Sequence, residues 1–130
     1  MSHLDVLKSA FKAMARGDAD GAVAHYTQDY VIEFPYPVFR GAFQVAGRDT
    51  VRDYLAAAFQ VFRFELEIDK VHPSGDPDLL IAEYHGLGRA LTTGKPYNNR
   101  YVGFWWFRDG AVCRTREYYD QGVATEALTP

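Results

Sequence analysis

Several features of secreted, membrane-bound or nucleic-acid-binding proteins are scarce in this chain of 130 residues. A single cysteine, Cys113, excludes an internal disulfide and is typical of a reducing compartment. No stretch approaches the roughly 20 apolar residues of a membrane-spanning helix. The N-terminal segment also lacks the continuous apolar core of a signal peptide. We therefore expect a cytoplasmic protein without a membrane partner.

The chain has no excess of positive charge either. The formal net charge is −3 and the pI is near 5.7. Because no basic face is evident, nucleic acid is not an expected partner. The four histidines are scattered and no HExxH or CxxC spacing occurs, so the sequence predicts no metal site. A glycine-rich phosphate loop is missing as well, and we expect no cofactor.

Aromatic residues, by contrast, are abundant. Nine tyrosines, nine phenylalanines and two tryptophans make up 15% of the chain. Such side chains fill cores, and they also line pockets for small organic ligands. A chain of this length is expected to form one domain, spanning residues 1–130, that buries roughly two-thirds of its unfolded surface.

Residues 79–120 form the stretch around which the rest of the chain is organised. They predict three long antiparallel strands joined by turns at Thr93–Pro96 and Asp109–Gly110. Asp-Gly between apolar runs is a strong hairpin signal, because a type I′ turn needs positive φ at both central residues. The flanking β-branched and aromatic residues suit a pleated, half-buried sheet.

Helices are predicted at three places upstream. The first begins at Ser2, where Asp5 completes a capping box, and shows apolar residues at helical spacing. A shorter one follows Asp18, and a third runs from Gly47 to about Phe62.

Two shorter strands are predicted from Asp29 to Phe34 and from Arg63 to Val71. Residues 35–46 are expected to be irregular, and the tail after 120 to form one helical turn. Strands grouped after helices predict an α+β fold. In this fold, three N-terminal-half helices lie on the concave face of a curved antiparallel sheet.

Alternation sorts the side chains of residues 79–120 onto two faces of the sheet. One face carries Tyr84, Gly86, Asn99, Tyr101, Gly103, Trp105, Cys113, Thr115, Glu117 and Tyr119. The other carries Val102, Phe104 and Trp106, with Arg114 and Arg116. Alternation alone does not show which face meets the helices.

Four segments carry a family resemblance: GRDTVRDYL, TGKPYN, the RDG turn and RTREYYD. With them the chain resembles the nuclear-transport-factor-2-like superfamily, which includes ketosteroid isomerase, limonene epoxide hydrolase and the SnoaL-like polyketide cyclases. From Gly47 onward it is most similar to the phenazine-biosynthesis A/B proteins. The shared motifs are Gly47-Arg48-Asp49, Asp76-Pro77, Glu83–Arg89 and Arg116-Glu117-Tyr118. The resemblance implies a cone-shaped α+β barrel around a cavity, and leaves the reaction open because this scaffold hosts many chemistries.

The resemblance places Glu117 where the phenazine proteins keep a pocket glutamate and the epoxide hydrolases a general-base aspartate. The face that carries Glu117 is then the pocket wall. Desolvation in an aromatic pocket raises the pKa of a carboxyl toward neutrality, which suits general acid/base catalysis. The expected ligand-binding residues are Tyr84, Asn99, Tyr101 and Tyr119 as hydrogen-bonding groups, Trp105 as a stacking wall, and Tyr54 and Phe62 on the helical side.

Two departures from these families argue against reactions by their mechanisms. Tyr84 and Gly86 stand where the epoxide hydrolases have an arginine and an aspartate. Phe34 stands before Pro35, where ketosteroid isomerase has its base. Glu33 is a second candidate catalytic residue, and alternation leaves open whether it faces the cavity or solvent.

The sequence supports two functional classes. One is a cofactor-free isomerase, dehydratase, cyclase or condensing enzyme that acts on a small hydrophobic or cyclic metabolite. The alternative is a non-catalytic ligand carrier on the same fold. The apolar outer face formed by Val102, Phe104 and Trp106 should not remain in contact with water. We expect a homodimer that buries this face, or a different partner chain in its place.

Overall fold

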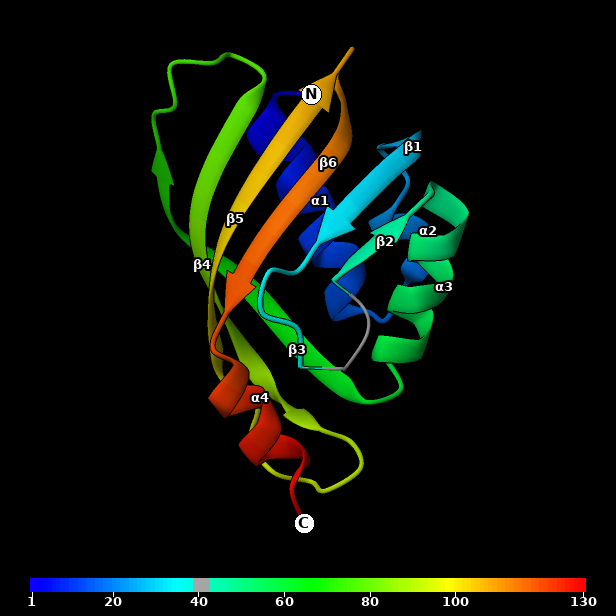
Figure 1. Cartoon of the computed structure of the whole chain (residues 1–130), viewed down its shortest axis with the longest axis vertical. Helices are drawn as coiled ribbons and strands as arrows, with labels where there is room; N and C mark the ends of the chain where they lie inside the picture. Colours follow the sequence, from blue (N-terminus) through cyan, green and yellow to red (C-terminus); the bar gives the residue numbers. More distant parts are fainter. Residues whose placement is uncertain (39–42) are drawn as a thin grey trace.

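A curved sheet and four helices make up the regular structure of residues 1–38 and 43–130, the part that this computed structural model describes (Figure 1). The helices are α1 (His3–Ala15), α2 (Ala19–Ala22), α3 (Arg48–Ala58) and α4 (Gln121–Leu128). The strands are β1 (Tyr26–Glu33), β2 (Gln44–Ala46), β3 (Phe62–His72), β4 (Leu79–Ala90), β5 (Asn99–Arg108) and β6 (Ala111–Tyr119). None of the helices in these two ranges has the length and apolar character needed to cross a bilayer.

The six strands lie in the order β2-β1-β6-β5-β4-β3. Strands β3 to β6 pair antiparallel, as predicted. Strand β1 runs parallel to β6, so the sheet is mixed and not purely antiparallel. The sheet is not closed, because β2 and β3 form its two edges.

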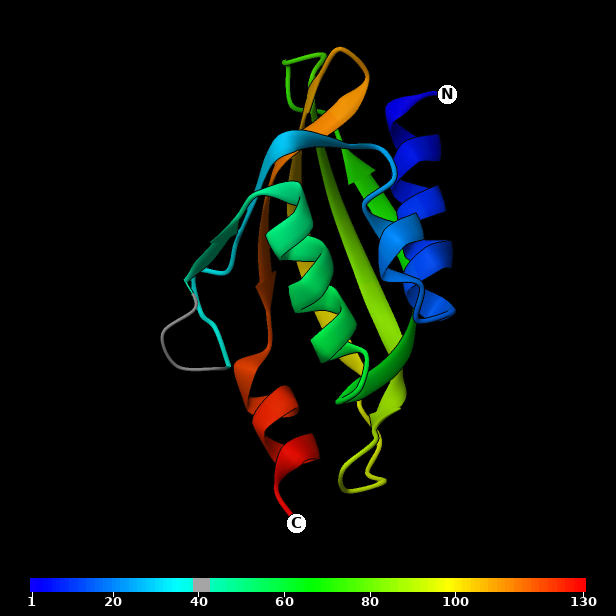
Figure 2. The ribbon, with the colours of Figure 1, turned by 90° about the vertical axis from the view of Figure 1, so that its right-hand side faces the viewer.

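The N-terminal-half helices cover the concave side of this sheet, which confirms the predicted α+β architecture. Helix α1 packs against β3 near one edge, and α3 packs against β1 near the other. Figure 2 shows both helices on the same side of the sheet. The cavity described below lies between these helices and the sheet.

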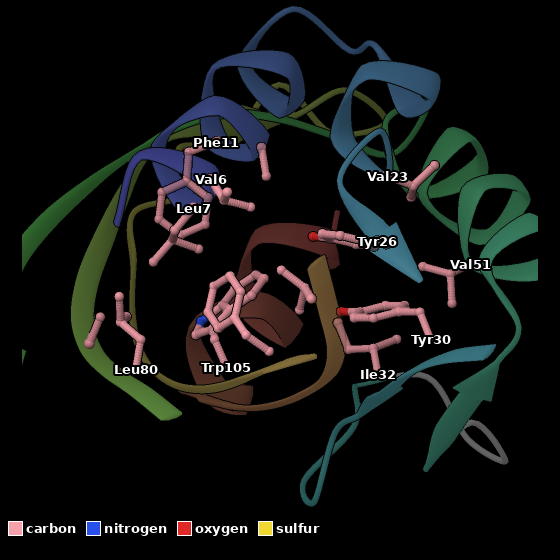
Figure 3. Close-up of a cluster of buried hydrophobic side chains, with 14 of the residues drawn as sticks. Val6, Leu7, Phe11, Val23, Tyr26, Tyr30, Ile32, Val51, Leu80 and Trp105 are labelled. Atoms are coloured by element: carbon pink, nitrogen blue, oxygen red, sulfur yellow. The ribbon is translucent and has the colours of Figure 1, made fainter. Parts of the chain in front are cut away.

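Aromatic and aliphatic side chains fill the space between the layers (Figure 3). Phe11 of α1 meets Trp105 of β5 edge to face, with ring centroids 6.0 Å apart. Val51 of α3 lies beside Tyr30 of β1. All four side chains are buried.

Local sequence signals explain where several helices and strands begin or end. Ser2 and Asp5 form the predicted capping box, and Asp18 caps α2 by accepting from the Gly21 N–H at 2.9 Å. Asp109 and Gly110 both have positive φ, at 53° and 81°, as a type I′ turn requires. Helix α3 ends at Ala58, four residues short of the expected Phe62, because Phe62 already pairs with Ala90 as the first residue of β3.

Three other expectations need correction. Strand β1 begins at Tyr26, not Asp29. Within the segment expected to be irregular, Gln44–Ala46 pairs with Val31–Glu33 as β2; residues 39–42 lie outside the described residues. The tail forms an eight-residue helix, because the Asp120 carboxylate accepts from the N–H groups of Gly122 and Val123.

A β-bulge changes the side-chain pattern of β6. The register shifts between the pairs Trp106–Arg114 and Phe107–Val112, so that Cys113 has no partner of its own. Val112 therefore points into the core and is fully buried. The Cys113 thiol donates to the Trp106 carbonyl at 3.5 Å. The alternation of an unbroken strand would place Cys113 on the same face as Glu117. Cys113 is, however, not among the described residues that line the cavity.

Candidate functional site

A cavity of about 110 Å³ opens between the sheet and the helices. Eleven of the twenty described residues that line it are aromatic, and they come from β1, α3, β3, β5, β6 and the segments between them. Glu117 supplies the only carboxyl group among the described lining residues, and none of these is lysine, arginine or histidine. The cavity is therefore an aromatic chamber with one acidic group.

The structure brings six of the nine predicted site residues to the cavity wall. These are Tyr54, Phe62, Tyr101, Trp105, Glu117 and Tyr119. Tyr84 and Asn99 lie directly behind the wall and reach it through hydrogen bonds. Glu33 lies elsewhere.

The Glu117 carboxylate is held by a buried tyrosine. Tyr84 of β4 donates its hydroxyl proton to Oε2 of Glu117 on β6, although β5 runs between these two strands. Gly103 of β5 is the register partner of Glu117, and it makes this crossing possible. A Cβ atom at this position would overlap both the Tyr84 hydroxyl and the Trp105 indole nitrogen.

Burial sets the acidity of Glu117. Removal from water raises its pKa from 4.5 to about 7, and the hydrogen bond from Tyr84 lowers the pKa by a smaller amount. Within residues 1–38 and 43–130, no lysine, arginine or histidine forms an ion pair with this carboxyl. Protonated and ionised Glu117 are therefore both populated near pH 7.

A group of tyrosines surrounds Glu117. Burial raises the pKa of each hydroxyl, and the negative charge of Glu117 raises it further. The group comprises Tyr26, Tyr30, Tyr54, Tyr84, Tyr97, Tyr101 and Tyr119. Burial raises the pKa of Tyr54, for example, to about 12. All seven therefore remain neutral phenols at physiological pH.

A hydrogen-bond chain ends at the Tyr101 hydroxyl. Asn99 Oδ1 accepts from the backbone N–H groups of Arg100 and Asp120, at 2.8 and 3.1 Å. Its Nδ2 must then be the donor to Tyr97 Oη at 3.1 Å. Tyr97 lies 3.0 Å from Tyr101 Oη and can donate to it. In that arrangement the Tyr101 proton is free for a ligand oxygen.

Two other tyrosine hydroxyls already have protein partners. Tyr30 donates to Thr115 Oγ1 at 2.7 Å. Tyr119 Oη accepts from the Val38 N–H at 3.0 Å, which ties β6 to the segment after β1. One buried side-chain polar atom of the described residues, Trp105 Nε1, has no hydrogen-bond partner.

Glu33 faces the opposite side of the sheet from Glu117. It is the register partner of Arg116, and its carboxylate forms ion pairs with Arg116 Nε at 2.8 Å and with Arg114. Its neighbours Ile32 and Phe34 line the cavity instead. Alternation alone had left the direction of Glu33 open, and in the structure Glu33 is not among the described residues that line the cavity.

Sequence reasoning missed the contribution of β1 and of the chain end. Tyr26, Tyr30 and Ile32 line the cavity from β1, Tyr97 from the turn after β4, and Ala124 from α4. The alternation of Tyr30, Ile32 and Phe34 was a usable signal, since it also turns Glu33 outward. No local sequence pattern indicated that Tyr97 lines the cavity, because it directly follows the proline of a predicted turn.

No three histidine, cysteine, aspartate or glutamate side chains in the described ranges are grouped closely enough to hold a metal ion. On the outer face, His85 pairs with Asp69 at 2.7 Å and His72 with Glu83 at 2.6 Å. These pairs are separate from the cavity.

The sequence of this chain is similar to those of several known proteins. A family model described as "SnoaL-like domain" matches residues 7–115. The uncharacterized protein YesE of Bacillus subtilis is 27% identical over 125 residues, covering 95% of this chain and 85% of YesE. An uncharacterized PhzA/B-like protein of Pseudomonas aeruginosa is 27% identical over 130 residues, covering 98% of this chain and 91% of the relative.

Solved structures agree in fold. A Bacillus subtilis protein provisionally named an isomerase superposes with a TM-score of 0.90 at 25% identity, covering 96% of this chain and 91% of that one. A Catenulispora acidiphila protein with a ketosteroid isomerase-like fold, crystallised with trimethylamine, has a TM-score of 0.81 at 14% identity. That match covers 100% of this chain and 96% of the other, and at this identity it shows the fold alone.

Gly103 offers a direct test of the Tyr84–Glu117 contact. Gly103→Ala is expected to lower the free energy of unfolding by about 1–3 kcal/mol, because the new methyl group displaces Tyr84 and Trp105. Gly86→Ala is the matched control, since the closest approach of its methyl group would be to the flexible end of Leu66, at 3.2 Å, and Tyr101 and Phe64 lie at ordinary contact distances of 3.5 and 3.6 Å. Urea unfolding measures both. Equal losses for the two variants would contradict the role given to Gly103.

Glu117→Gln is expected to stabilise the fold at alkaline pH. A pKa near 7 instead of 4.5 means that burying the charged form costs on the order of 3 kcal/mol. This cost is absent below pH 4.5, grows between pH 4.5 and 7, and is complete above pH 7. Urea unfolding of both proteins at pH 5 and pH 8 measures the difference. A stability difference that does not change with pH would show that the carboxyl is not desolvated.

Proposed function

The chain belongs to the SnoaL-like domain family, and from this premise we propose that its cavity is the active site of a small-molecule enzyme. Glu117 is the proposed acid/base group and moves a proton without a cofactor. The reaction class is isomerisation, dehydration, cyclisation or condensation. The observation that carries the proposal is a single carboxyl with a pKa of about 7, in an aromatic cavity.

A pKa near the working pH is what general acid/base catalysis needs, because both protonation states are then available. Tyr84 holds Oε2 of Glu117 and leaves Oε1 to the ligand. The hydroxyl of Tyr101, supported by Tyr97 and Asn99, supplies a donor to a ligand oxygen. In this scheme the Glu117 carboxylate removes a proton next to a polarised carbonyl and returns it at another atom.

The volume of the cavity limits the size of the ligand. Its volume of about 110 Å³ is below the roughly 300–1,000 Å³ of typical ligand pockets. We therefore expect a compact ligand with at most one small ring. Relatives of this fold have been crystallised with trimethylamine and with polyporic acid. These complexes support small-molecule binding as the proposed role of the cavity.

A non-catalytic ligand carrier is the second candidate. It is favoured by one observation: Glu117 is the only carboxyl among the described lining residues, because Glu33 is bound to Arg114 and Arg116 outside the cavity. A lone carboxyl orients a ligand as readily as it moves a proton. The two candidates differ in turnover, which the next experiment measures.

Proton exchange separates the enzyme from the carrier. Small cyclic ketones are incubated with the protein in D₂O, and deuterium uptake next to the carbonyl is followed by NMR. An enzyme is expected to accelerate uptake with an apparent pKa near 7, and Glu117→Gln is expected to reduce the rate by about 100-fold or more. Glu83→Gln, a carboxylate change on the outer face, is the control. Full exchange in Glu117→Gln would refute the role of Glu117; ligand binding without exchange would support the carrier.

We also propose a homodimer through the outer face of β5. Val102, Phe104 and Trp106 remain partly exposed there, and Arg116 lies 5.5 Å from the Trp106 ring. Light scattering at micromolar concentration is expected to give twice the 14.7 kDa chain mass. Phe104→Glu should give a folded monomer, whereas Leu91→Glu, beyond the end of β4, should remain dimeric. A monomeric wild-type protein would rule out this interface.

A further inference from the structure

We propose that the ligand of the Glu117 cavity carries a compact organic cation, an ammonium or quaternary nitrogen group, held between the Glu117 carboxylate and the surrounding tyrosine rings. This inference rests on the proposed function for the location of the ligand. It goes beyond that function in naming the charge that the ligand brings.

The charge balance of the cavity is the first argument. Glu117 is the only carboxyl among the described lining residues, which include no lysine, arginine or histidine. Its hydrogen-bond donor within residues 1–38 and 43–130, Tyr84, is neutral. The two arginines nearest to it along β6, Arg114 and Arg116, pair with Glu33 on the opposite face. A carboxylate in an apolar cavity without a counter-charge is costly, and a cationic ligand removes that cost.

The rings around Glu117 supply the second argument. The face of an aromatic ring carries negative electrostatic potential and attracts cations within about 6 Å of its centroid. Aromatic side chains reach this cavity from several directions: Tyr30 from β1, Tyr54 from α3, Trp105 from β5 and Tyr119 from β6. Their number makes the chamber suitable for a cation with an apolar surface, such as a methylated ammonium group.

The tyrosines keep this property at neutral pH. Burial and the charge of Glu117 raise the pKa of every tyrosine in the group, so that the hydroxyls stay protonated. An anionic ligand would meet the Glu117 charge and find no described cationic side chain in the wall. A neutral ligand would gain ring contacts but would leave the carboxylate without a counter-charge.

Binding of a permanent cation should depend on pH in a defined direction. The cation pairs with ionised Glu117, and this form is lost as the pH falls through about 7. At pH 6 roughly one-tenth of the carboxyl is ionised, and at pH 8 roughly nine-tenths. The affinity is therefore expected to fall about tenfold from pH 8 to pH 6.

A pair of isosteric probes tests the charge directly. Choline carries a quaternary nitrogen that does not titrate, and 3,3-dimethylbutan-1-ol has the same shape with a neutral carbon in its place. Isothermal titration calorimetry at pH 6 and pH 8 measures both. Choline is expected to bind about tenfold or more tightly than the alcohol at pH 8, and to lose this advantage at pH 6. The alcohol should bind equally at both pH values.

Variants then locate the effect. Glu117→Gln keeps the side-chain shape and a partner for Tyr84, and should remove both the preference for choline and its pH dependence. Glu83→Gln, which deletes a carboxylate on the outer face, should change neither. An unchanged preference in Glu117→Gln overturns the inference.

The remaining outcomes separate this inference from the proposed function. Equal affinity for the two probes in the wild type, or binding of the alcohol alone, refutes the cationic ligand while the acid/base role of Glu117 stands. Absence of binding by either probe at millimolar concentration also refutes a compact cation of this kind. The deuterium-exchange experiment decides the acid/base role independently, because its probes are neutral ketones.

Discussion

The removal of one carboxyl group from water is the constraint on which the rest of the site depends. Glu117 is kept without a cationic partner among the described residues, although two arginines lie one and three positions before it on β6. Strand alternation sends those arginines to the other face, where buried Glu33 holds them. Gly103 leaves the space through which Tyr84 reaches the carboxyl. Strand β6 thus carries ion-paired arginines on its outer face and, on its inner face, a carboxyl group without a described cationic partner.

Much of this arrangement follows from sequence patterns with a local physical basis. Period-two alternation in β4, β5 and β6 correctly grouped Tyr84, Tyr101, Trp105 and Glu117 on one face. The Asp-Gly turn set the register of the last hairpin because both residues adopt positive φ. The fold class followed from the order of helices and strands, with the resemblance adding the cavity.

The parts that sequence reasoning missed depend on contacts between distant segments. The parallel pairing of β1 with β6 joins residues about 80 positions apart, and no local pattern specifies it. The bulge at Cys113 inverts the alternation at the start of β6, since one extra residue turns Val112 inward. Tyr97 gains its role only because Asn99 and Tyr101 fix its hydroxyl. Site residues of this kind emerge from tertiary structure.

The short helix α4 has a consequence for solvent at the site. Asp120 caps it, and the Asn99 amide holds the Asp120 backbone, so that the apolar residue Ala124 closes part of the cavity. The helix contributes no charge to Glu117, yet it helps to keep the local dielectric constant low. A displacement of α4 would admit water and return the carboxyl toward the proton affinity of an ordinary glutamate. A helix that offers the ligand only a methyl group would thereby control the chemistry by excluding water.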